Sequence, residues 1–353
     1  MITESEIQAA IPSLLKSAGL NGDFSLHPVP GGGNNRGYRI ELDRSRYFLK
    51  AYFRHENDPR DRLDSEFRFT QFAWNQGLRA LPQPLARDSE HGMGLYEFVE
   101  GRRLQASEIT EEKIRIAVDF FREVNRHKEA PEAQMLPIGS EACFSLASHL
   151  RCVDRRLQML EAVKDASPID GAARDFIQNE MKTIWARIKE AVNRSAGGPA
   201  AMERELTHDE RCLSPSDFGF HNALLTPEGR IRFLDFEYAG WDDAAKMVCD
   251  FLCHVGTPIP RSLHPFFIDI IVNDISKPEI LLRRIALLRP VYQVKWCCIL
   301  LNEFIKVGAD RRRFASSPEV FDAVKEAQLA KARAMFGQID LNAAPFVEMR
   351  VTK

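Results

Sequence analysis

The chain has 353 residues, of which 44% are hydrophobic and 28% charged, a composition that is ordinary for a folded globular protein. At roughly 150 residues per domain, this length predicts about two domains, large enough to fold without disulfides or structural metals. Lysine and arginine number 48 and aspartate and glutamate number 50, so the net charge is −2. Such a balance provides no overall field that attracts nucleic acid or an anionic membrane, and neither is expected as a partner.

The cysteines and the first residues indicate the compartment. Seven cysteines without a CxxC pair argue against both a disulfide framework and a zinc ribbon. The opening MITESEIQAA carries acidic residues where a signal peptide carries a basic cluster, and no apolar run reaches the roughly 20 residues of a membrane span. We therefore expect a cytoplasmic protein.

The first hundred residues are predicted to form a sheet with two helices. Thr3 and Glu6 have the spacing of a capping box, and the helix they begin stops at Gly19. A second helix is predicted from Leu63 to Gly77, where apolar residues return at helical spacing. Five antiparallel strands are predicted over residues 24–30, 38–42, 46–53, 81–88 and 92–100.

Beyond residue 100 the pattern becomes helical. Residues 100–103 look like a hinge, which divides the chain into predicted domains 1–100 and 101–353. The one exception to the helical pattern is 213–240, which reads as strand, turn and strand, and an isolated β segment of this kind often carries a site. Helices are predicted over residues 107–127, 145–162, 170–194 and 242–254, and in several stretches between 265 and 336.

A glycine-rich turn, PGGGNNRG at residues 30–37, lies between two of the predicted strands. Three consecutive glycines allow backbone N–H groups to approach phosphate oxygens closely. An ordinary hairpin turn has the same composition, and the sequence contains neither the Walker pattern nor GxGxxG before a helix. From these residues alone, both interpretations remain.

A lysine inside an apolar strand is the second feature. Lys50 lies in FLKAYF, and Glu66 follows sixteen residues later on a predicted helix. A buried lysine needs an anionic partner, which either a helix carboxylate or the phosphates of a ligand can provide. The alternative is a lysine on an edge strand that reaches solvent.

The third feature is a hairpin rich in oxygen ligands. Asp217 and Asn222 lie five residues apart in a turn that enters a strand, and Asp235 ends the next strand. One hairpin can therefore bring all three side chains together, and a few carboxylate and amide oxygens suit magnesium. The alternative is a turn in which Asp and Asn bond only to the backbone.

The order of these features resembles that of the aminoglycoside phosphotransferase and choline kinase superfamily, over about residues 24–255. It consists of a glycine turn, a strand lysine, a helix glutamate, a hinge, D-x-x-x-x-N and D-F-E. The resemblance implies an α+β, two-lobed protein-kinase-like fold, with a small five-stranded antiparallel sheet lobe and a larger, mainly helical lobe. It also implies a phosphotransferase that uses ATP and Mg²⁺ and acts on a hydroxyl of a small metabolite such as a sugar or an amino alcohol.

The resemblance assigns a role to each matching residue. Asp217 would be the catalytic carboxylate that orients the acceptor hydroxyl. Lys50 would contact the α and β phosphates while Glu66 holds it in place. The metal ligands would be Asn222, Asp235 and Glu237. The remaining nucleotide-binding residues would be Gly31, Gly32, Gly33, Asn34 and Asn35 in the glycine turn, and Glu97, Phe98 and Val99 at the hinge.

Two positions depart from the family pattern. Pro215 and Ser216 stand where His-Gly usually precedes the catalytic aspartate, and Met247 stands where a second aspartate usually follows D-F-E. Neither change removes a phosphate or magnesium ligand, which favours an active enzyme. The alternative is a nucleotide-binding, kinase-like regulatory protein without turnover.

Charge gives some information about the acceptor. Residues 241–353 contain 16 Lys and Arg against 13 Asp and Glu, an excess that disfavours a polycationic acceptor such as an aminoglycoside. An anionic or sugar-like acceptor could instead face one of two arginine groups, and a choline-type cation could face an aromatic ring. One arginine group consists of Arg283, Arg284 and Arg289, and the other of Arg311, Arg312 and Arg313. The aromatic ring is that of Trp296.

Overall fold

A computed structural model describes residues 2–30, 35–54, 60–273, 275, 277–305 and 319–341. The chain divides into two compact units. The first unit comprises residues 1–140, 212–241 and 259–263, and the second comprises 141–211, 242–258 and 264–353. The domain boundary predicted near residue 100 falls inside the first unit, which holds both the five-stranded sheet and the hairpin segment after residue 212.

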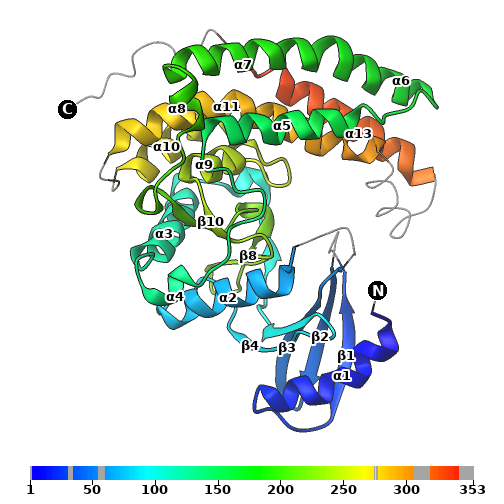
Figure 1. Cartoon of the computed structure of the whole chain (residues 1–353). Coiled ribbons are helices and arrows are strands. Elements are labelled where there is room, and N and C mark those ends of the chain that lie inside the picture. Colours follow the sequence, from blue (N-terminus) through cyan, green and yellow to red (C-terminus); the bar gives the residue numbers. More distant parts are fainter. Residues whose placement is uncertain are drawn as a thin grey trace. The chain divides into compact units, whose positions relative to one another are not determined.

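The first unit contains an antiparallel sheet of five strands in the order β1-β2-β3-β5-β4 (Figure 1). The strands are β1 (Phe24–Val29), β2 (Arg36–Leu42), β3 (Ser45–Ala51), β4 (Pro84–Asp88) and β5 (Met93–Glu97). Helix α1 (Glu4–Ser17) begins at the predicted capping box of Thr3 and Glu6. Its apolar residues pack with Ile40 of β2 and Leu49 of β3 into one core cluster, because their helical spacing places them on a single face.

Helix α2 (Arg62–Asn75) packs against β4 and β5. The side chain of Asp61 caps its first turn, and its buried residues include Leu63 and Phe69. The helix also buries one carboxylate, that of Glu66, which is 5% exposed. A buried charge requires a partner, and a partner for Glu66 is expected on the sheet beside α2.

Two further small sheets have the strand orders β6-β8-β9 and β10-β7. Residues 102 and 103, in the predicted hinge, form strand β6 and pair with β8, so this segment is hydrogen-bonded to the hairpin. A cluster of phenylalanine rings from α3 and the hairpin anchors the D-F-E segment through Phe236. The elements are β6 (Arg102–Arg103), α3 (Glu111–Arg126), α4 (Pro131–Gln134), β7 (Cys212–Ser214), β8 (Ala223–Leu225), β9 (Ile231–Phe233) and β10 (Gly240–Asp242), with 3₁₀ turns at Ala106–Glu108, Phe220–Asn222 and Arg261–Leu263.

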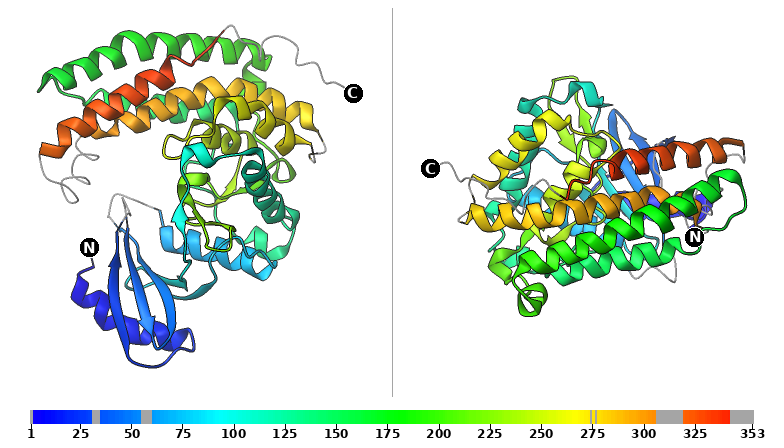
Figure 2. Two further views of the ribbon diagram at one scale, coloured as in Figure 1. Left: turned by 180° about the vertical axis from the view of Figure 1, so that it is seen from behind. Right: turned by 90° about the horizontal axis from the view of Figure 1, so that it is seen from above.

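The second unit is helical, and α11 (Pro278–Leu300) packs against α5, α7, α9 and α13 (Figure 2). The other helices are α5 (Leu146–Leu160), α6 (Pro168–Asp175), α7 (Lys182–Ala196), α8 (Pro199–Glu203), α9 (Ala244–Cys253), α10 (His264–Val272) and α13 (Glu319–Phe336). Short helical turns occupy Phe176–Met181, His208–Glu210 and Leu301–Phe304. Within the described ranges, no helix is both long and apolar enough to cross a membrane.

Candidate active site

Lys50 lies on β3, the central strand of the sheet, opposite Gly37 and Gly94 on the two neighbouring strands. The residue is 7% exposed, so the alternative of an edge lysine that reaches solvent is wrong. Its Nζ lies 2.6 Å from Oε2 of Glu66 and 2.6 Å from Oδ1 of Asp235. This single ammonium therefore joins the sheet, α2 and the segment after β9.

Both carboxylate oxygens of Glu66 accept hydrogen bonds. Oε2 accepts from Lys50 and, at 2.8 Å, from the hydroxyl of Tyr52, which also lies 2.8 Å from the hydroxyl of Tyr96. Oε1 accepts from the backbone N–H of Phe236 at 3.2 Å. Glu66 thus holds the lysine and the backbone of the D-F-E segment at the same time.

The charge state of this cluster follows from its burial and from its ion pairs. Burial alone would lower the pKa of Lys50, but the attraction of Asp235, Glu66 and Glu237 outweighs burial and raises that pKa well above its ordinary value. Burial raises the pKa of Tyr52 and of Tyr96 well above the ordinary value, so both hydroxyls stay protonated. Lys50 therefore carries a fixed positive charge, and a lysine ammonium is a typical partner for phosphate.

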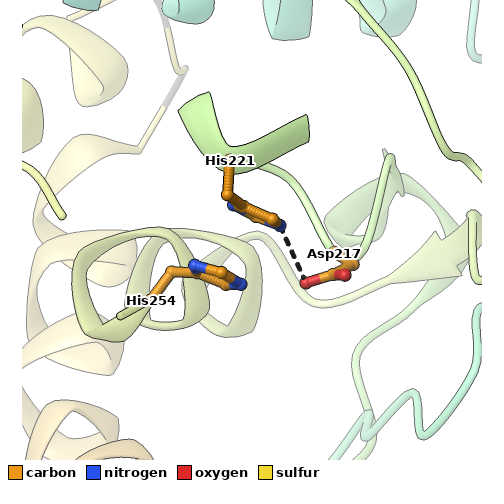
Figure 3. A group of neighbouring side chains, drawn as sticks. All are labelled: Asp217, His221 and His254. Atoms are coloured by element: carbon orange, nitrogen blue, oxygen red, sulfur yellow. Dashed lines mark ion pairs between the residues drawn. The ribbon is translucent and has the colours of Figure 1, made fainter. Parts of the chain in front are cut away.

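Asp217 and Asn222 lie together in the turn between β7 and β8. The amide of Asn222 donates to the backbone oxygen of Asp217 at 3.0 Å and to its Oδ2 at 3.4 Å. On the other side, Nε2 of His221 lies 3.3 Å from Oδ1 of Asp217 (Figure 3). No role is predicted for His221 from the sequence, although its i,i+4 spacing from Asp217 is a usable signal.

Backbone bonds bring Asp235 beside Asn222. The N–H of Leu234 donates to the backbone oxygen of Asn222 at 2.8 Å, so the two candidate ligands sit on paired segments. Asp235 has a left-handed backbone with φ +66°, which aspartate tolerates better than most residues. Its side chain is 41% exposed, so it is open to a ligand while it contacts Lys50.

The hinge is tied to β9 through a side chain that the sequence did not indicate. The N–H of Glu97 donates to the backbone oxygen of Gln83 at 2.8 Å, so it is already engaged. The carboxylate of Glu97 accepts from Arg232 at 2.7 Å. Arg232 lies on β9, three residues before Asp235, and no spacing pattern relates it to Glu97.

Asn35 and Glu237 contact each other, although 202 residues separate them. The amide of Asn35 donates to Oε2 of Glu237, and its Oδ1 accepts from the N–H of Phe53 at 3.0 Å. Glu237 is 3% exposed. The other residues predicted for the glycine turn, Gly31, Gly32, Gly33 and Asn34, lie outside the described residues.

The residues considered for the acceptor have partners within the second unit. Arg283 bonds the backbone oxygen of Ser195, Arg284 bonds Asp243, Arg289 lies 3.0 Å from a ring nitrogen of His264, and the indole of Trp296 donates to Asp250. Trp296 is 8% exposed, as expected for a core residue rather than for the wall of an open cation site. The three arginines of residues 311–313 lie outside the described residues.

Comparisons with solved structures agree with this fold. A spectinomycin phosphotransferase solved with ADP and spectinomycin superposes with a TM-score of 0.62 at 14% identity, over 95% of this chain and 98% of that chain. An ethanolamine kinase of Plasmodium vivax gives 0.58 at 14% identity, over 95% and 92%. A choline kinase of Streptococcus pneumoniae gives 0.58 at 13% identity, over 94% and 99%.

Sequence comparison gives the family. No curated protein matches the chain by sequence. The phosphotransferase enzyme family, APH, matches residues 25–274, which is most of the chain. This match includes Lys50, Glu66, Asp217 and Asp235, and the predicted two-lobed kinase-like fold is confirmed by the solved structures. The chain therefore belongs to the phosphotransferase enzyme family.

Proposed function

We propose that this protein is a kinase that transfers the terminal phosphoryl group of ATP to a hydroxyl of a small metabolite, with magnesium as cofactor. The observation that carries the proposal is Lys50, a buried ammonium held between the carboxylates of Glu66 and Asp235. Membership of the phosphotransferase family supports it, as does the ADP in the structure of the spectinomycin phosphotransferase.

The nucleotide is assigned to the cluster around Lys50. Phosphoryl transfer needs positioning and neutralisation of charge, and no covalent intermediate on the protein is required. Lys50 provides a fixed charge for the α and β phosphates, and Glu66 holds it in place. At the hinge, the backbone of Phe98 and Val99 is the better candidate for adenine, because neither N–H donates to a backbone carbonyl of the described residues.

The metal is assigned to Asp235 and Asn222. The amide nitrogen of Asn222 is directed to Asp217, which leaves its oxygen as the ligand atom, and both side chains offer the hard oxygen donors that magnesium prefers. Asp235 is exposed enough to leave room for the waters and phosphate oxygens that complete a magnesium site. When bound, the ion neutralises negative charge on the phosphates.

Asp217 is assigned to the acceptor. Its carboxylate would accept a hydrogen bond from the acceptor hydroxyl and direct the oxygen of that hydroxyl toward the phosphorus atom. His221 and Asn222 contact different oxygens of this carboxylate and so restrict its rotation. A restricted carboxylate loses less conformational freedom when the acceptor binds.

A regulatory protein without turnover is the second candidate. It is favoured by Ser216, which occupies a left-handed conformation directly before Asp217, where the family usually has glycine. Such a protein would bind Mg·ATP and transfer no phosphate. The contacts around Lys50 do not distinguish the two candidates, because both require a bound nucleotide.

Transfer of labelled phosphate from ATP tests the proposal. The acceptor panel contains amino alcohols, sugars, sugar phosphates and nucleosides, and Mg·ATP binding is measured by calorimetry in parallel. We expect magnesium-dependent phosphorylation of at least one class, and its loss in Asp217→Asn, which keeps the size of the side chain. Binding without transfer to any acceptor or to water would support the regulatory candidate, and the absence of binding would contradict both.

A further inference from the structure

Phe53, the second residue after β3, has both of its backbone polar groups bonded to side chains. Its N–H donates to Oδ1 of Asn35 at 3.0 Å, and its carbonyl accepts from Nη1 of Arg62 at 2.8 Å. Asn35 immediately precedes β2, and Arg62 is the first residue of α2. A single residue just beyond the strand that carries Lys50 is therefore held by side chains from two other elements.

The same two side chains both reach Glu237. The amide of Asn35 donates to Oε2 of Glu237, and Nε of Arg62 lies 3.9 Å from Oε1. Lys50 is also 3.9 Å from Oε2. Each oxygen of this carboxylate thus faces a donor or a cation of the protein, which compensates for burying it.

Burial separates Glu237 from Asp235, although both were assigned to magnesium by resemblance. The side chain of Glu237 is 3% exposed, whereas that of Asp235 is 41% exposed. Magnesium is reluctant to lose its waters and usually keeps several of them, so a ligand needs open space beside it. Asp235 has that space, and the surroundings of Glu237 are filled by protein groups.

We propose that Glu237 is a positioning residue that clamps the segment after β9 to the end of β3 through Asn35 and Arg62, and that it does not bind magnesium. Arg62 and Glu66 lie one helical turn apart on α2, so neighbouring parts of one helix hold Glu237 and the N–H of Phe236. The clamp thereby sets the place of Asp235, two residues earlier. This inference rests on the proposed function only for its metal and nucleotide measurements.

An exchange of the amide of Asn35 and the carboxylate of Glu237 tests the clamp. In Asn35→Asp, two carboxylates face each other, and in Glu237→Gln, two amides do. The double variant N35D/E237Q restores one carboxylate and one amide in reversed order, with the negative charge now at position 35. We expect N35D to lower the thermal midpoint measured without metal or nucleotide, and the double variant to recover most of that loss. If N35D does not fold at all but the double variant does, the double variant has recovered the lost stability in the same sense.

The magnesium dependence of ADP binding separates a clamp from a ligand. For a clamp, the double variant restores the pairing, so its magnesium concentration at half-saturation returns to within about threefold of that of the unchanged protein, whatever shift E237Q shows alone. For a metal ligand, both variants need at least about tenfold more magnesium, as the loss of a ligand or of its support typically costs 10- to 100-fold in affinity. Asp235→Asn serves as the positive control for such a shift.

Two results would overturn the inference. One is a tenfold magnesium shift in E237Q that the exchange does not reverse. The other is a thermal midpoint, measured without metal or nucleotide, that is unchanged in N35D or that stays as low in the double variant as in N35D. If the unchanged protein binds no Mg·ADP at all, the proposed function fails, while the metal-free midpoints still decide whether the clamp exists.

Discussion

At the scale of single residues, one ammonium lies among three carboxylates. Lys50 lies 2.6 Å from Glu66 and from Asp235, and 3.9 Å from Glu237. Loss of one partner from a buried ion pair leaves charge without compensation, and this costs more than the pair itself contributes. Lys50 therefore contributes to folding as well as to the proposed binding of phosphate.

We predict that Lys50→Met lowers the free energy of unfolding at pH 7 by about 3 to 5 kcal/mol, the usual effect of breaking a buried pair. Methionine has a similar length, so packing is largely kept. Burial raises the pKa of Glu66, and in Lys50→Met the cation that opposes that rise is lost. The folded variant then binds more protons than the unfolded chain, so its loss of stability should be smaller at pH 5 than at pH 7. Urea unfolding of both proteins at the two pH values measures this, and equal losses would contradict the argument.

Substitution of Asp235 and of Asp217 should impair the protein in different ways. Asp235→Asn is expected to lose magnesium affinity and transfer together, and high magnesium should restore part of the loss, because the change weakens a ligand. Asp217→Asn is expected to leave nucleotide affinity nearly unchanged while transfer falls by roughly 10²- to 10⁴-fold, the usual effect of a lost general base. Nucleotide titration and single-turnover transfer measure both variants. Full transfer by Asp217→Asn would remove that residue from the mechanism.

At the scale of elements, the turn before Asp217 is strained. Ser216 has φ +63°, a conformation that is costly for residues with a Cβ atom. Its hydroxyl is buried and has no hydrogen-bond partner in the part of the chain that the structure describes. The glycine usual in the family would remove both costs.

We predict that Ser216→Gly raises the free energy of unfolding by about 1 kcal/mol, since relief of strain and of an unpaired hydroxyl exceeds the entropy cost of glycine. Ser216→Ala is the matched control. It removes the same hydroxyl but keeps the Cβ atom, so its free energy of unfolding should rise less than that of Ser216→Gly. Thermal midpoints of the three proteins give the order, and a decrease in Ser216→Gly would show that the turn is not strained.

Helix α9 begins at a buried ionic cap. Asp243 accepts from the N–H of Ala245 at 2.8 Å, and its Oδ2 also contacts His149 and Arg284. Burial alone would raise the pKa of Asp243, but Arg284 and His149 lower it to about 2. Since the ordinary value is 3.8, the folded state holds this proton less tightly than the unfolded chain does.

We predict that the cap contributes about 2 kcal/mol above pH 4, and that the contribution disappears as the pH falls from about 4 to about 2. Asp243→Asn keeps a good capping residue but has no charge to lose. The stability difference between the two proteins should therefore shrink on acidification. Unfolding measured at pH 5, 4 and 3 gives that difference, and a gap independent of pH would contradict the assignment.

At the scale of the whole molecule, several carboxylates of the second unit are buried in ion pairs within that unit. Asp242 pairs with Lys246 at 2.6 Å, and Asp250 pairs with Lys295 at 3.1 Å. These carboxylates are buried, so they cannot form the exposed acidic surface that collects a polycation. The excess of basic residues over 241–353 acts in the same direction.

We predict that kanamycin-like polycations are poor acceptors. Without electrostatic steering, the rate of association falls by about 10- to 1000-fold relative to a site of matching charge. Transfer to kanamycin is compared with transfer to neutral sugars of similar size at physiological salt. Efficient phosphorylation of kanamycin under these conditions would show that the charge balance does not select the acceptor.

Local pattern in the sequence determined the elements of this protein and the order of its functional motifs. The capping box of α1, the strand that carries Lys50 and the helix that carries Glu66 all lie where short-range spacing predicts them. Only the tertiary structure decided the pairing of Asn35 with Glu237 and of Glu97 with Arg232, across 202 and 135 residues. Spacing records which face of an element is buried, because burial follows the period of the helix or strand. The spacing does not show which distant side chain contacts that face, because such a contact depends on how separate elements pack together.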